Sequence, residues 1–440
     1  MKRVLVLGAG LVSRPLVSYL ARWPDVALTV GDLDGAKAAK VLHGVERGRA
    51  IVMAPNDDAD LFAKVGDADI VVSLLPYPLH PKVAKAAIAH RVPLITTSYV
   101  SAEMAALDGP AREAGVLLLN EIGLDPGLDH MSAMRVIGRL RREGSTLTSF
   151  RSCCGGLPAP ESNTNPWGYK FSWSPRGVLA AGRNAARFID GGRIVEVPAE
   201  RLFTHVARYV VPEVGVLEVY PNRDSVLYAA TYGLDGIGTM FRGTLRYPGW
   251  CETLDAVSRL GLLDDDPRAS LGATTCAELM EALAAPGPAP LPERVASRLA
   301  VAADGAVMDR LKWVGMFSDR PLPVVPASPI DALCARMTES MSYAEGERDM
   351  IVLRHEFGFV EVGGRPERLV ATLVAFGDSG GDSAMARTVS LPAAVAARLV
   401  LDGRIAATGV RIPVDAEIFD PVLDALEPLG IAFRESRTAP

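Results

Sequence analysis

Residues 3–13 of the 440-residue chain, RVLVLGAGLVS, decide the fold. The compact apolar run that ends at Leu7 predicts a strand buried on both faces, and apolar residues at helical spacing follow over residues 12–21. Gly8 permits a tight turn between strand and helix, and Gly10 lets the backbone approach a pyrophosphate at the helix N-terminus. Ser13 takes the place of a third glycine. The stretch therefore predicts a dinucleotide-binding loop made by Gly8, Gly10, Leu11 and Val12.

Strand and helix patterns alternate through the following hundred residues. Further strands are expected at 27–30, 50–53, 70–74, 94–96 and 116–119, and helices at 35–42, 58–65, 82–90 and 102–114. Such alternation predicts a parallel sheet with helices on both faces. The expected fold class is therefore α/β, with a Rossmann-type domain at 1–125 that is completed by about 405–440.

Asp32 stands at the end of the second expected strand, about 20 residues after the glycine loop. A carboxylate at this place accepts hydrogen bonds from the ribose hydroxyls and repels a 2′-phosphate, which favours NAD over NADP. The alternative is that Asp32 only caps the helix that begins near Asp34; the glycine loop favours the cofactor role. Lys37 and Lys40 lie nearby, so NADP stays possible.

The rest of the chain changes in character after residue 120. Residues 126–254 and 346–404 predict a mixed α/β domain for substrate binding and dimerisation, with strands at 193–197, 208–211, 226–231, 349–357 and 368–376. Residues 255–345 predict an all-helical insertion, interrupted by an exposed linker at 286–290, PGPAP. Closing helices are expected at 391–401 and 415–429.

Composition limits the function classes. Apolar residues make up 49% of the chain, which excludes intrinsic disorder, and 46 basic against 52 acidic residues give a net charge of −6. This charge argues against nucleic acid or an anionic membrane as partner. No run approaches the roughly 18 apolar residues of a membrane span. The five cysteines lack metal-binding spacing, so we expect a reduced, cytoplasmic protein without a metal site.

Several longer motifs identify a family. They are NEIGLDPGLDH (120–130), CGGLPAPE (154–161), NPWGYKFSWSPRGVL (165–179), PNRDS (221–225), RGTLRYPGW (242–250) and ERDMIVLRHE (347–356). With these motifs, nearly the whole chain resembles the L-glutamate-forming saccharopine dehydrogenases, also called saccharopine reductases. The NADP-using members carry an Arg-containing loop after the second strand, whereas this chain has Gly-Asp-Leu-Asp at 31–34. This departure agrees with the preference for NAD.

The resemblance implies the reaction and the residues that serve it. Saccharopine would be oxidised at its CH–NH bond by NAD or NADP and hydrolysed to L-glutamate and 2-aminoadipate 6-semialdehyde, a step of lysine metabolism. The family's acid–base and positioning roles map to Tyr99, Asp125 and Cys154. The residues alone favour plainer roles: an Asp-Pro turn, a buried phenol and a small core residue. His130 is a rival acid–base group, although we expect it under the nicotinamide or stabilising the turn.

Saccharopine carries three carboxylates, which arginine binds through two parallel hydrogen bonds. The resemblance assigns this task to Arg223 and Arg246; without it, Arg223 would be expected to pair with Asp224 on the surface. Further contacts to the substrate are expected from Ser98, Tyr99, Asp125, Thr244 and Leu245. The nicotinamide side of the cofactor site is expected to include Leu75, Pro76, Leu124, Asp125 and His130, while Lys170 and Arg176 stay unassigned.

Two other functions fit parts of the pattern. Carboxynorspermidine synthase and related imine-reducing enzymes share the architecture, but a diamine substrate requires carboxylates where this chain has arginines. A redox-sensing regulator would need a DNA-binding or partner surface, which the acidic charge does not offer. We expect a homodimer formed by the β-rich domain. The physiological direction of the reaction stays open.

Overall fold

The computed structural model describes residues 1–54, 57–267, 275–322 and 326–438. Residues 268–274 and 323–325 of the expected helical insertion, and residues 439–440 of the expected closing segment, lie outside the described residues. The chain divides into two compact units. Unit 1 consists of residues 1–146, 360–367 and 371–436, and unit 2 of residues 147–359, 368–370 and 437–440.

Unit 1 is built on a seven-stranded parallel sheet in the order β15-β6-β5-β4-β1-β2-β3. The order reverses between β1 and β4, as in dinucleotide-binding folds. Every strand expected in the first 120 residues is present. The strands are β1 (Lys2–Leu7), β2 (Val26–Asp32), β3 (Gly48–Val52), β4 (Ile70–Ser73), β5 (Leu94–Thr96), β6 (Leu117–Leu119) and β15 (Gly409–Arg411).

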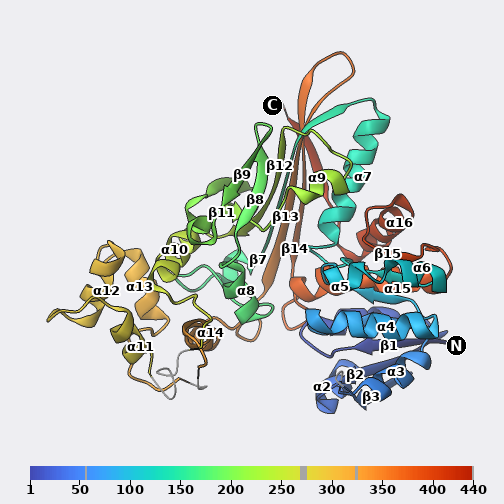
Figure 1. Cartoon of the computed structure of the whole chain (residues 1–440), viewed down its shortest axis with the longest axis horizontal. Coiled ribbons are helices and arrows are strands. Elements are labelled where there is room, and N and C mark those ends of the chain that lie inside the picture. Colours follow the sequence, from blue (N-terminus) through green and yellow to red (C-terminus); the bar gives the residue numbers. More distant parts are fainter. Residues whose placement is uncertain (55–56, 268–274, 323–325, 439–440) are drawn as a thin grey trace. The chain divides into compact units, whose positions relative to one another are not determined.

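Helices cover both faces of this sheet (Figure 1). Leu5 and Leu7 of β1 belong to a core that includes side chains of α3, α4 and α6, whereas the alternate residues Val4 and Val6 face the other side and are also buried. Strands buried on both faces are apolar throughout, which explains the continuous run at residues 4–7. The helices are α1 (Ser13–Ala21), α2 (Gly35–Val41), α3 (Asp58–Gly66), α4 (His80–His90), α5 (Ala102–Ala105), α6 (Asp108–Ala114), α7 (Leu128–Arg142), α15 (Ala384–Leu401) and α16 (Ala416–Leu426), with 3₁₀ turns η1 (Tyr77–Leu79) and η5 (Glu427–Leu429).

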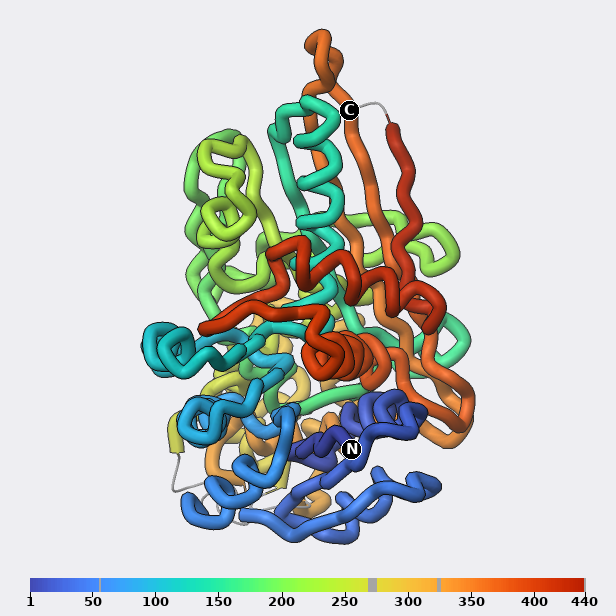
Figure 2. Tube along the Cα trace, turned by 90° about the vertical axis from the view of Figure 1, so that its right-hand side faces the viewer, coloured from blue at the N-terminus to red at the C-terminus, as the bar shows by residue number. Residues whose placement is uncertain are grey.

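Helix α15 returns from late in the sequence to pack on α1 and α16 (Figure 2). It has the length and composition of a membrane span, contrary to our expectation that no run would approach one, but 72% of it is buried inside the structure. Burial between α1, α16 and the sheet accounts for its apolar surface. Unit 1 therefore extends beyond the expected segments 1–125 and 405–440, because α7 and α15 also belong to it.

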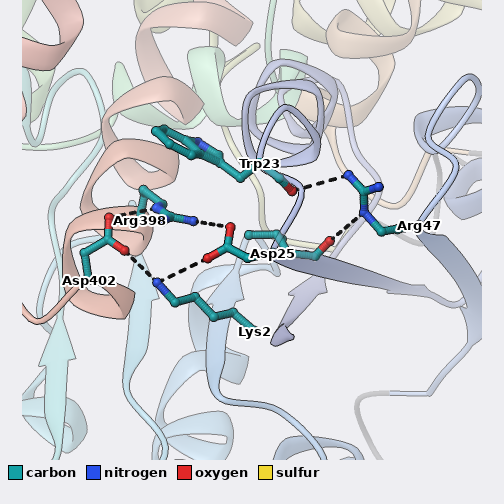
Figure 3. A network of polar contacts seen from close by, with 7 residues as sticks. Lys2, Trp23, Asp25, Arg47, Arg398 and Asp402 are labelled. Carbon is teal, nitrogen blue, oxygen red and sulfur yellow. Dashed lines mark hydrogen bonds and ion pairs between the residues drawn. The ribbon is translucent and has the colours of Figure 1, made fainter.

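A network of ion pairs ties the end of α15 to the start of the sheet (Figure 3). Arg398 contacts Asp25 at 2.8 Å and Asp402 at 2.7 Å, and Lys2 contacts Asp402 at 2.6 Å and Asp25 at 3.5 Å. The Arg398 guanidinium also lies 4.2 Å from the ring centroid of Trp23. These contacts lie at the amino end of β1, away from the glycine loop at its carboxyl end.

A second sheet of nine strands runs in the order β10-β11-β12-β7-β13-β14-β16, and β8 joins it beside β12 with β9 next to it. Strands β7 and β12 are parallel, and β11 is antiparallel to β12. The strands are β7 (Thr146–Pro158), β8 (Ala186–Asp190), β9 (Arg193–Val197), β10 (Ala207–Val211), β11 (Gly215–Pro221), β12 (Thr239–Arg246), β13 (Asp349–Val360), β14 (Pro366–Phe376) and β16 (Arg434–Thr438).

Between β12 and β13 the described residues form five helices, connecting loops and one isolated β-bridge, between Thr275 and Pro321. The helices are α10 (Trp250–Leu260), α11 (Cys276–Leu283), α12 (Leu291–Leu299), α13 (Ala306–Trp313) and α14 (Pro329–Ser340). The proline-rich stretch at 286–290 lies between α11 and α12, where a linker was expected. Unit 2 also contains α8 (Pro175–Ala181), α9 (Leu227–Thr231), η2 (Pro160–Ser162) and η3 (Ala199–Thr204).

Two of the expected elements are wrong. The expected strand at 226–231 is the helix α9, because the Asp224 carboxylate accepts the Val226 N–H at 2.9 Å and the Ser225 carbonyl accepts the Tyr228 N–H. These contacts begin a helical turn, and the leucine and two alanines of the segment favour a helix. The expected helix at 102–114 is two helices, α5 and α6, separated by Ala106 and Leu107.

Candidate functional site

The residues that the sequence assigns to unit 1 gather at the carboxyl edge of the parallel sheet. The glycine loop follows β1, Asp32 ends β2, Leu75 and Pro76 follow β4, Ser98 and Tyr99 follow β5, and Asp125 lies beyond β6. In open α/β sheets this edge is where ligands bind.

The glycine loop is shaped for a phosphate group. Gly8 has a φ of +98°, and a Cβ there would lie 3.0 Å from the Leu74 carbonyl oxygen, so only glycine fits without strain. A Cβ on Gly10 would meet nothing within 4 Å, which leaves open space beside the backbone. The buried Ser13 hydroxyl donates to the Gly10 carbonyl at 2.8 Å, so a serine is accommodated in place of the third glycine. Leu11 keeps 76% of its surface exposed beside this space.

Asp32 links the glycine loop to the end of β2. One carboxylate oxygen accepts the Ala9 N–H at 2.7 Å, and the other accepts the Asp34 N–H at 2.9 Å. The cap of α2 is Asp34, whose side chain accepts the Ala36 N–H at 2.9 Å. The alternative that Asp32 is only a helix cap is therefore wrong. Each carboxylate oxygen of Asp32 has a second lone pair available, as binding a ribose requires.

Tyr99 and Asp125 come together as the resemblance implies. The Tyr99 hydroxyl donates to Asp125 Oδ1 at 3.2 Å, and both residues are partly exposed. Asp125 is the only residue of the motif at 120–130 that is not buried. Its neighbour Gly127 has a φ of +145° and crosses Gly123 so closely that a Cβ would lie 2.2 Å from the Gly123 nitrogen. The glycines of this motif therefore fold a tight loop that presents one carboxylate.

His130 is fully buried, and its Nε2 lies 2.8 Å from Glu121 Oε2. Glu121 has a φ of +57°, unusual for a residue with a side chain, and its other carboxylate oxygen accepts the Val100 N–H at 3.0 Å. This pair therefore joins the loop after β6 to the loop after β5. The arrangement fits the expected role of His130 in stabilising the turn, and a contact with the nicotinamide stays a prediction.

Residues outside the predicted set complete this edge. His80 begins α4 and is buried between Ser73 at the end of β4 and Ser98 after β5. Its Nδ1 lies 3.0 Å from Ser73 Oγ, and its Nε2 lies 2.8 Å from Ser98 Oγ. Burial lowers the pKa of His80 to about 4, so the ring is neutral near pH 7. The one indication of this contact in the sequence is that His80 lies seven residues after Ser73, a serine at the end of a buried strand.

In unit 2, the expected site residues Cys154, Thr244 and Arg246 lie on one face of the second sheet. Thr244 of β12 is paired with Cys154 of β7 on one side and with Tyr220 of β11 on the other. Directly paired residues point to the same face, and Arg246 follows Thr244 on that face. Cys154 is buried, with 8% of its surface exposed. Leu245 points to the opposite face and is fully buried.

Arg246 lies in a buried aromatic pocket. Its guanidinium carbon is 4.9 Å from the ring centroid of Tyr169 and 5.4 Å from that of Trp250, and only 5% of the residue is exposed. One Nη donates to the Leu245 carbonyl at 2.8 Å, whereas Nε has no hydrogen-bond partner among the described residues. Glu218 is paired with Arg246 across the strands, but its carboxylate accepts the Cys251 N–H at 2.6 Å. A buried cation without a carboxylate partner is costly unless an anion binds to it.

The aromatic pocket contains further donors that lack partners within the described part of the chain. They are the Tyr169 hydroxyl and the Trp250 indole N–H. Burial raises the pKa of the Tyr169 phenol, which therefore keeps its proton as a donor. Both residues belong to motifs quoted for the resemblance, but their types alone suggested only core packing.

Arg223 is exposed, in a left-handed turn after β11 with a φ of +52°. Asp224 accepts a hydrogen bond from Arg187 at 3.0 Å. Arg223 lies two residues beyond the end of β11, whereas Glu218, the strand partner of Arg246, lies inside that strand. The two arginines therefore occupy different places on unit 2, and a shared substrate stays a prediction.

Lys170 and Arg176 have protein partners. The Lys170 ammonium is buried and pairs with Glu347 and the Thr164 hydroxyl, and Arg176 pairs with Asp331 at 2.9 Å. These contacts indicate structural roles for both side chains.

The parallel sheet, the glycine loop and the Asp32 carboxylate define a dinucleotide-binding protein of the Rossmann class. Residues 4–119 match the family described as Saccharopine dehydrogenase NADP binding domain, and residues 123–431 match Saccharopine dehydrogenase C-terminal domain.

Curated relatives match along the whole chain. "Saccharopine dehydrogenase [NADP(+), L-glutamate-forming]" of Saccharomyces cerevisiae is 39% identical and that of Schizosaccharomyces pombe 38%, with at least 99% of each chain covered. "Alpha-aminoadipic semialdehyde synthase, mitochondrial" of Bos taurus is 38% identical over 99% of this chain and 48% of its own length. The apo structure of the histidine-tagged L-Glu-forming saccharopine dehydrogenase from Saccharomyces cerevisiae matches over 100% of both chains, with a TM-score of 0.91 and 38% identity. The chain belongs to the saccharopine dehydrogenase family.

Proposed function

We propose that this chain oxidises saccharopine to L-glutamate and 2-aminoadipate 6-semialdehyde with a nicotinamide dinucleotide, in lysine metabolism. The observation that carries the proposal is the buried guanidinium of Arg246, which has no carboxylate partner among the described residues. A substrate with three carboxylates supplies the missing anion. Family membership over the whole chain supports the same reaction.

The residues of the glycine loop fit a dinucleotide. The space beside Gly10 accommodates a pyrophosphate at the N-terminus of α1, and Asp32 accepts hydrogen bonds from the ribose. When bound, the nicotinamide accepts a hydride from the lysine-derived ε-carbon of the substrate. We infer a preference for NAD, because the Asp32 carboxylate repels a 2′-phosphate. The fungal relatives are named for NADP(+), so the preference would distinguish this chain from them.

The remaining chemistry needs proton transfers, for which Tyr99 and Asp125 are placed. Oxidation removes a proton from the secondary amine and leaves an imine, and water then adds to the imine carbon. The resulting carbinolamine breaks its C–N bond, and the leaving glutamate nitrogen takes a proton. A carboxylate that already accepts a hydrogen bond from a phenol can take and return these protons. Cys154 is proposed as a further group at the substrate, on the unit 2 face that carries Arg246.

A diamine substrate, as in carboxynorspermidine synthase, is not favoured. Its ammonium groups would need carboxylates, whereas Arg246 presents a guanidinium, and the Glu218 carboxylate opposite it accepts the Cys251 N–H.

The test is the absorbance at 340 nm of purified protein with saccharopine and either NAD or NADP. Formation of the reduced dinucleotide is expected with saccharopine and not with carboxynorspermidine, and more efficiently with NAD than with NADP. Absence of reduction with both dinucleotides at any saccharopine concentration would overturn the proposed function.

We also propose a homodimer, which rests on exposed apolar side chains of unit 2. A cytoplasmic location stays a prediction from the sequence. Ile194, Val210 and Val216 expose apolar side chains on β9, β10 and β11 of unit 2, which is the kind of surface that a second copy covers. Light scattering of the purified protein tests the dimer, which predicts a mass near twice the 46.7 kDa of one chain.

A further inference from the structure

A buried histidine connects two serines at the ligand-binding edge of unit 1. His80 is 3% exposed and lies between Ser73, which is fully buried, and Ser98, which is partly exposed. The Ser73 hydroxyl has only one hydrogen-bond partner in the part of the chain that the structure describes, His80 Nδ1 at 3.0 Å. The Ser98 hydroxyl likewise has one, His80 Nε2 at 2.8 Å.

The burial of Ser73 selects the tautomer of His80. If Nδ1 carried the proton, it would donate to Ser73 Oγ, and the Ser73 hydroxyl hydrogen would be buried without an acceptor. If Nε2 carries the proton, Ser73 donates to Nδ1 and Nε2 donates to Ser98 Oγ, so every group is satisfied. A buried donor without a partner disfavours the first arrangement by roughly ten-fold or more. The neighbouring Thr96 hydroxyl lies 3.4 Å from Nδ1 and 3.2 Å from Nε2, and in this tautomer it can only share the single Nδ1 lone pair with Ser73.

This tautomer determines what Ser98 can do. Because Ser98 Oγ accepts from His80, its own hydrogen is free to donate to a ligand. We propose that His80 is a positioning residue that turns the Ser98 hydroxyl into a hydrogen-bond donor for a substrate carboxylate. The inference rests on the proposed function for the identity of that substrate.

The backbone around Ser98 is held from the other side. The Ser98 carbonyl accepts the Glu121 N–H at 3.1 Å, and the Val100 N–H donates to the Glu121 carboxylate at 3.0 Å. The Ser98 N–H itself donates to Thr96 Oγ1 at 3.3 Å. With its backbone fixed, the serine has one remaining freedom, the direction of its hydroxyl hydrogen, and His80 sets it. Tyr99 follows directly, so the donor lies next to the Tyr99–Asp125 pair.

Two matched variants separate this role from simple packing. The side-chain amide of glutamine reaches as far as Nε2 of histidine, whereas that of asparagine reaches only as far as Nδ1. His80→Gln therefore keeps the donor to Ser98, and His80→Asn keeps only a partner for Ser73. We expect His80→Asn to raise the KM for saccharopine roughly ten-fold, as loss of a hydrogen bond to a charged group predicts. His80→Gln restores most of the loss, and the KM for the dinucleotide changes less than two-fold in both variants.

A double-mutant cycle tests whether His80 acts through Ser98. Ser98→Ala alone should raise the KM for saccharopine as much as His80→Asn does, and adding His80→Asn to Ser98→Ala should change it little further. Equal KM values for His80→Asn, His80→Gln and the unmodified protein would overturn the inference. So would additive losses in the double variant, or a rise confined to the KM for the dinucleotide.

Failure of the proposed function gives a different result. In that case the unmodified protein does not reduce a dinucleotide with saccharopine. The tautomer is then measured directly by NMR of the protein labelled with ¹⁵N-histidine. The chain has six histidines, and the signal that is missing from the spectrum of His80→Gln belongs to His80. A proton on Nε2 is expected, and a proton on Nδ1 would overturn the inference whatever the substrate.

Discussion

The edge of the parallel sheet in unit 1 and the aromatic pocket around Arg246 in unit 2 differ in whether their polar side chains have hydrogen-bond partners. At the sheet edge the functional side chains have protein partners: Asp125 accepts from Tyr99, and Ser98 contacts His80. In the pocket the Arg246 Nε, the Tyr169 hydroxyl and the Trp250 N–H are buried without partners among the described residues. The first arrangement orients groups before a ligand arrives, and the second leaves donors that a bound anion satisfies.

This difference separates chemistry from binding. Groups already oriented by the protein are suited to transfer protons in a fixed geometry. Buried donors without partners destabilise the empty protein, and a ligand that satisfies them recovers that free energy as affinity. Variants of the acid–base pair Tyr99 and Asp125 should therefore lower kcat, whereas variants of groups that bind a carboxylate, Ser98 at the sheet edge and Arg246 in the pocket, should raise KM.

The largest effect is expected for Asp125→Asn, which keeps the shape of the side chain and removes its charge. Loss of the acid–base group should lower kcat by roughly a thousand-fold, with a small change in the KM for saccharopine. Steady-state kinetics with saccharopine measures both values. Tyr99→Phe serves as a graded control and should lower kcat by roughly ten-fold, because it removes the hydroxyl that donates to Asp125 and keeps the carboxylate. A rise in KM with kcat unchanged would mean that Asp125 binds the substrate and does not transfer protons.

Arg246→Met should raise the KM for saccharopine by about a hundred-fold, because a charge-assisted contact to a carboxylate is lost. The KM for the dinucleotide should change by less than about three-fold. Because Arg246 has no carboxylate partner among the residues that the structure describes, methionine should also leave the melting temperature unchanged or raise it.

Arg336→Met is the matched control for Arg246. Arg336 is equally buried, but it contacts Glu339 at 2.8 Å and the Pro321 carbonyl at 3.0 Å. Its loss should lower the melting temperature and leave the KM for saccharopine unchanged. If both arginine variants lower the melting temperature and raise both KM values alike, Arg246 has a folding role and the pocket is no anion site.

The sequence predicts unit 1 well because its signals are local. A strand buried on both faces must be apolar, and a turn with positive φ at Gly8 requires glycine. The same reasoning failed at residues 226–231, where two hydrogen bonds to Asp224 and Ser225 begin a helical turn. These bonds depend on the side chain and carbonyl immediately before the segment, which periodicity does not reveal.

The site was predicted in part. The motifs indicated Tyr99, Asp125 and Arg246, and the structure places the first two in contact. His80 and Trp250 were missed as site components, because a buried histidine or tryptophan has the same appearance in sequence whether it supports a core or a ligand. Only tertiary contacts show that His80 faces Ser98 and that Trp250 lies beside Arg246.

A smaller effect is expected from Asp32→Arg, which changes the choice of cofactor at the sheet edge. Replacing a carboxylate by a cation should shift the ratio of kcat/KM for NAD to that for NADP toward NADP by about ten-fold or more. The variant also loses the hydrogen bond to the Ala9 N–H, so both efficiencies should fall. An unchanged ratio would mean that Asp32 orders the glycine loop without contacting the ribose.

The smallest effect is expected from Asp25→Asn, in the network shown in Figure 3 at the amino end of β1. The hydrogen bond from Arg398 lowers the pKa of Asp25, so this carboxylate stabilises the fold above its ordinary pKa, and the contribution is lost as the pH falls through the lowered value. At pH 7 the variant should melt no more than about 3 °C below the unmodified protein, because the pair is partly exposed. The difference should shrink as the pH falls below the ordinary pKa of an aspartate, about 4, and it should also shrink in 1 M salt at pH 7. Asp304→Asn, at an exposed position, is the control and should show no difference at either pH.

Both kcat and KM should stay unchanged in the Asp25 variant, since its contacts lie far along β1 from the glycine loop. A changed KM for the dinucleotide would mean that the two ends of unit 1 are coupled and that polar contacts at its amino end also orient the site.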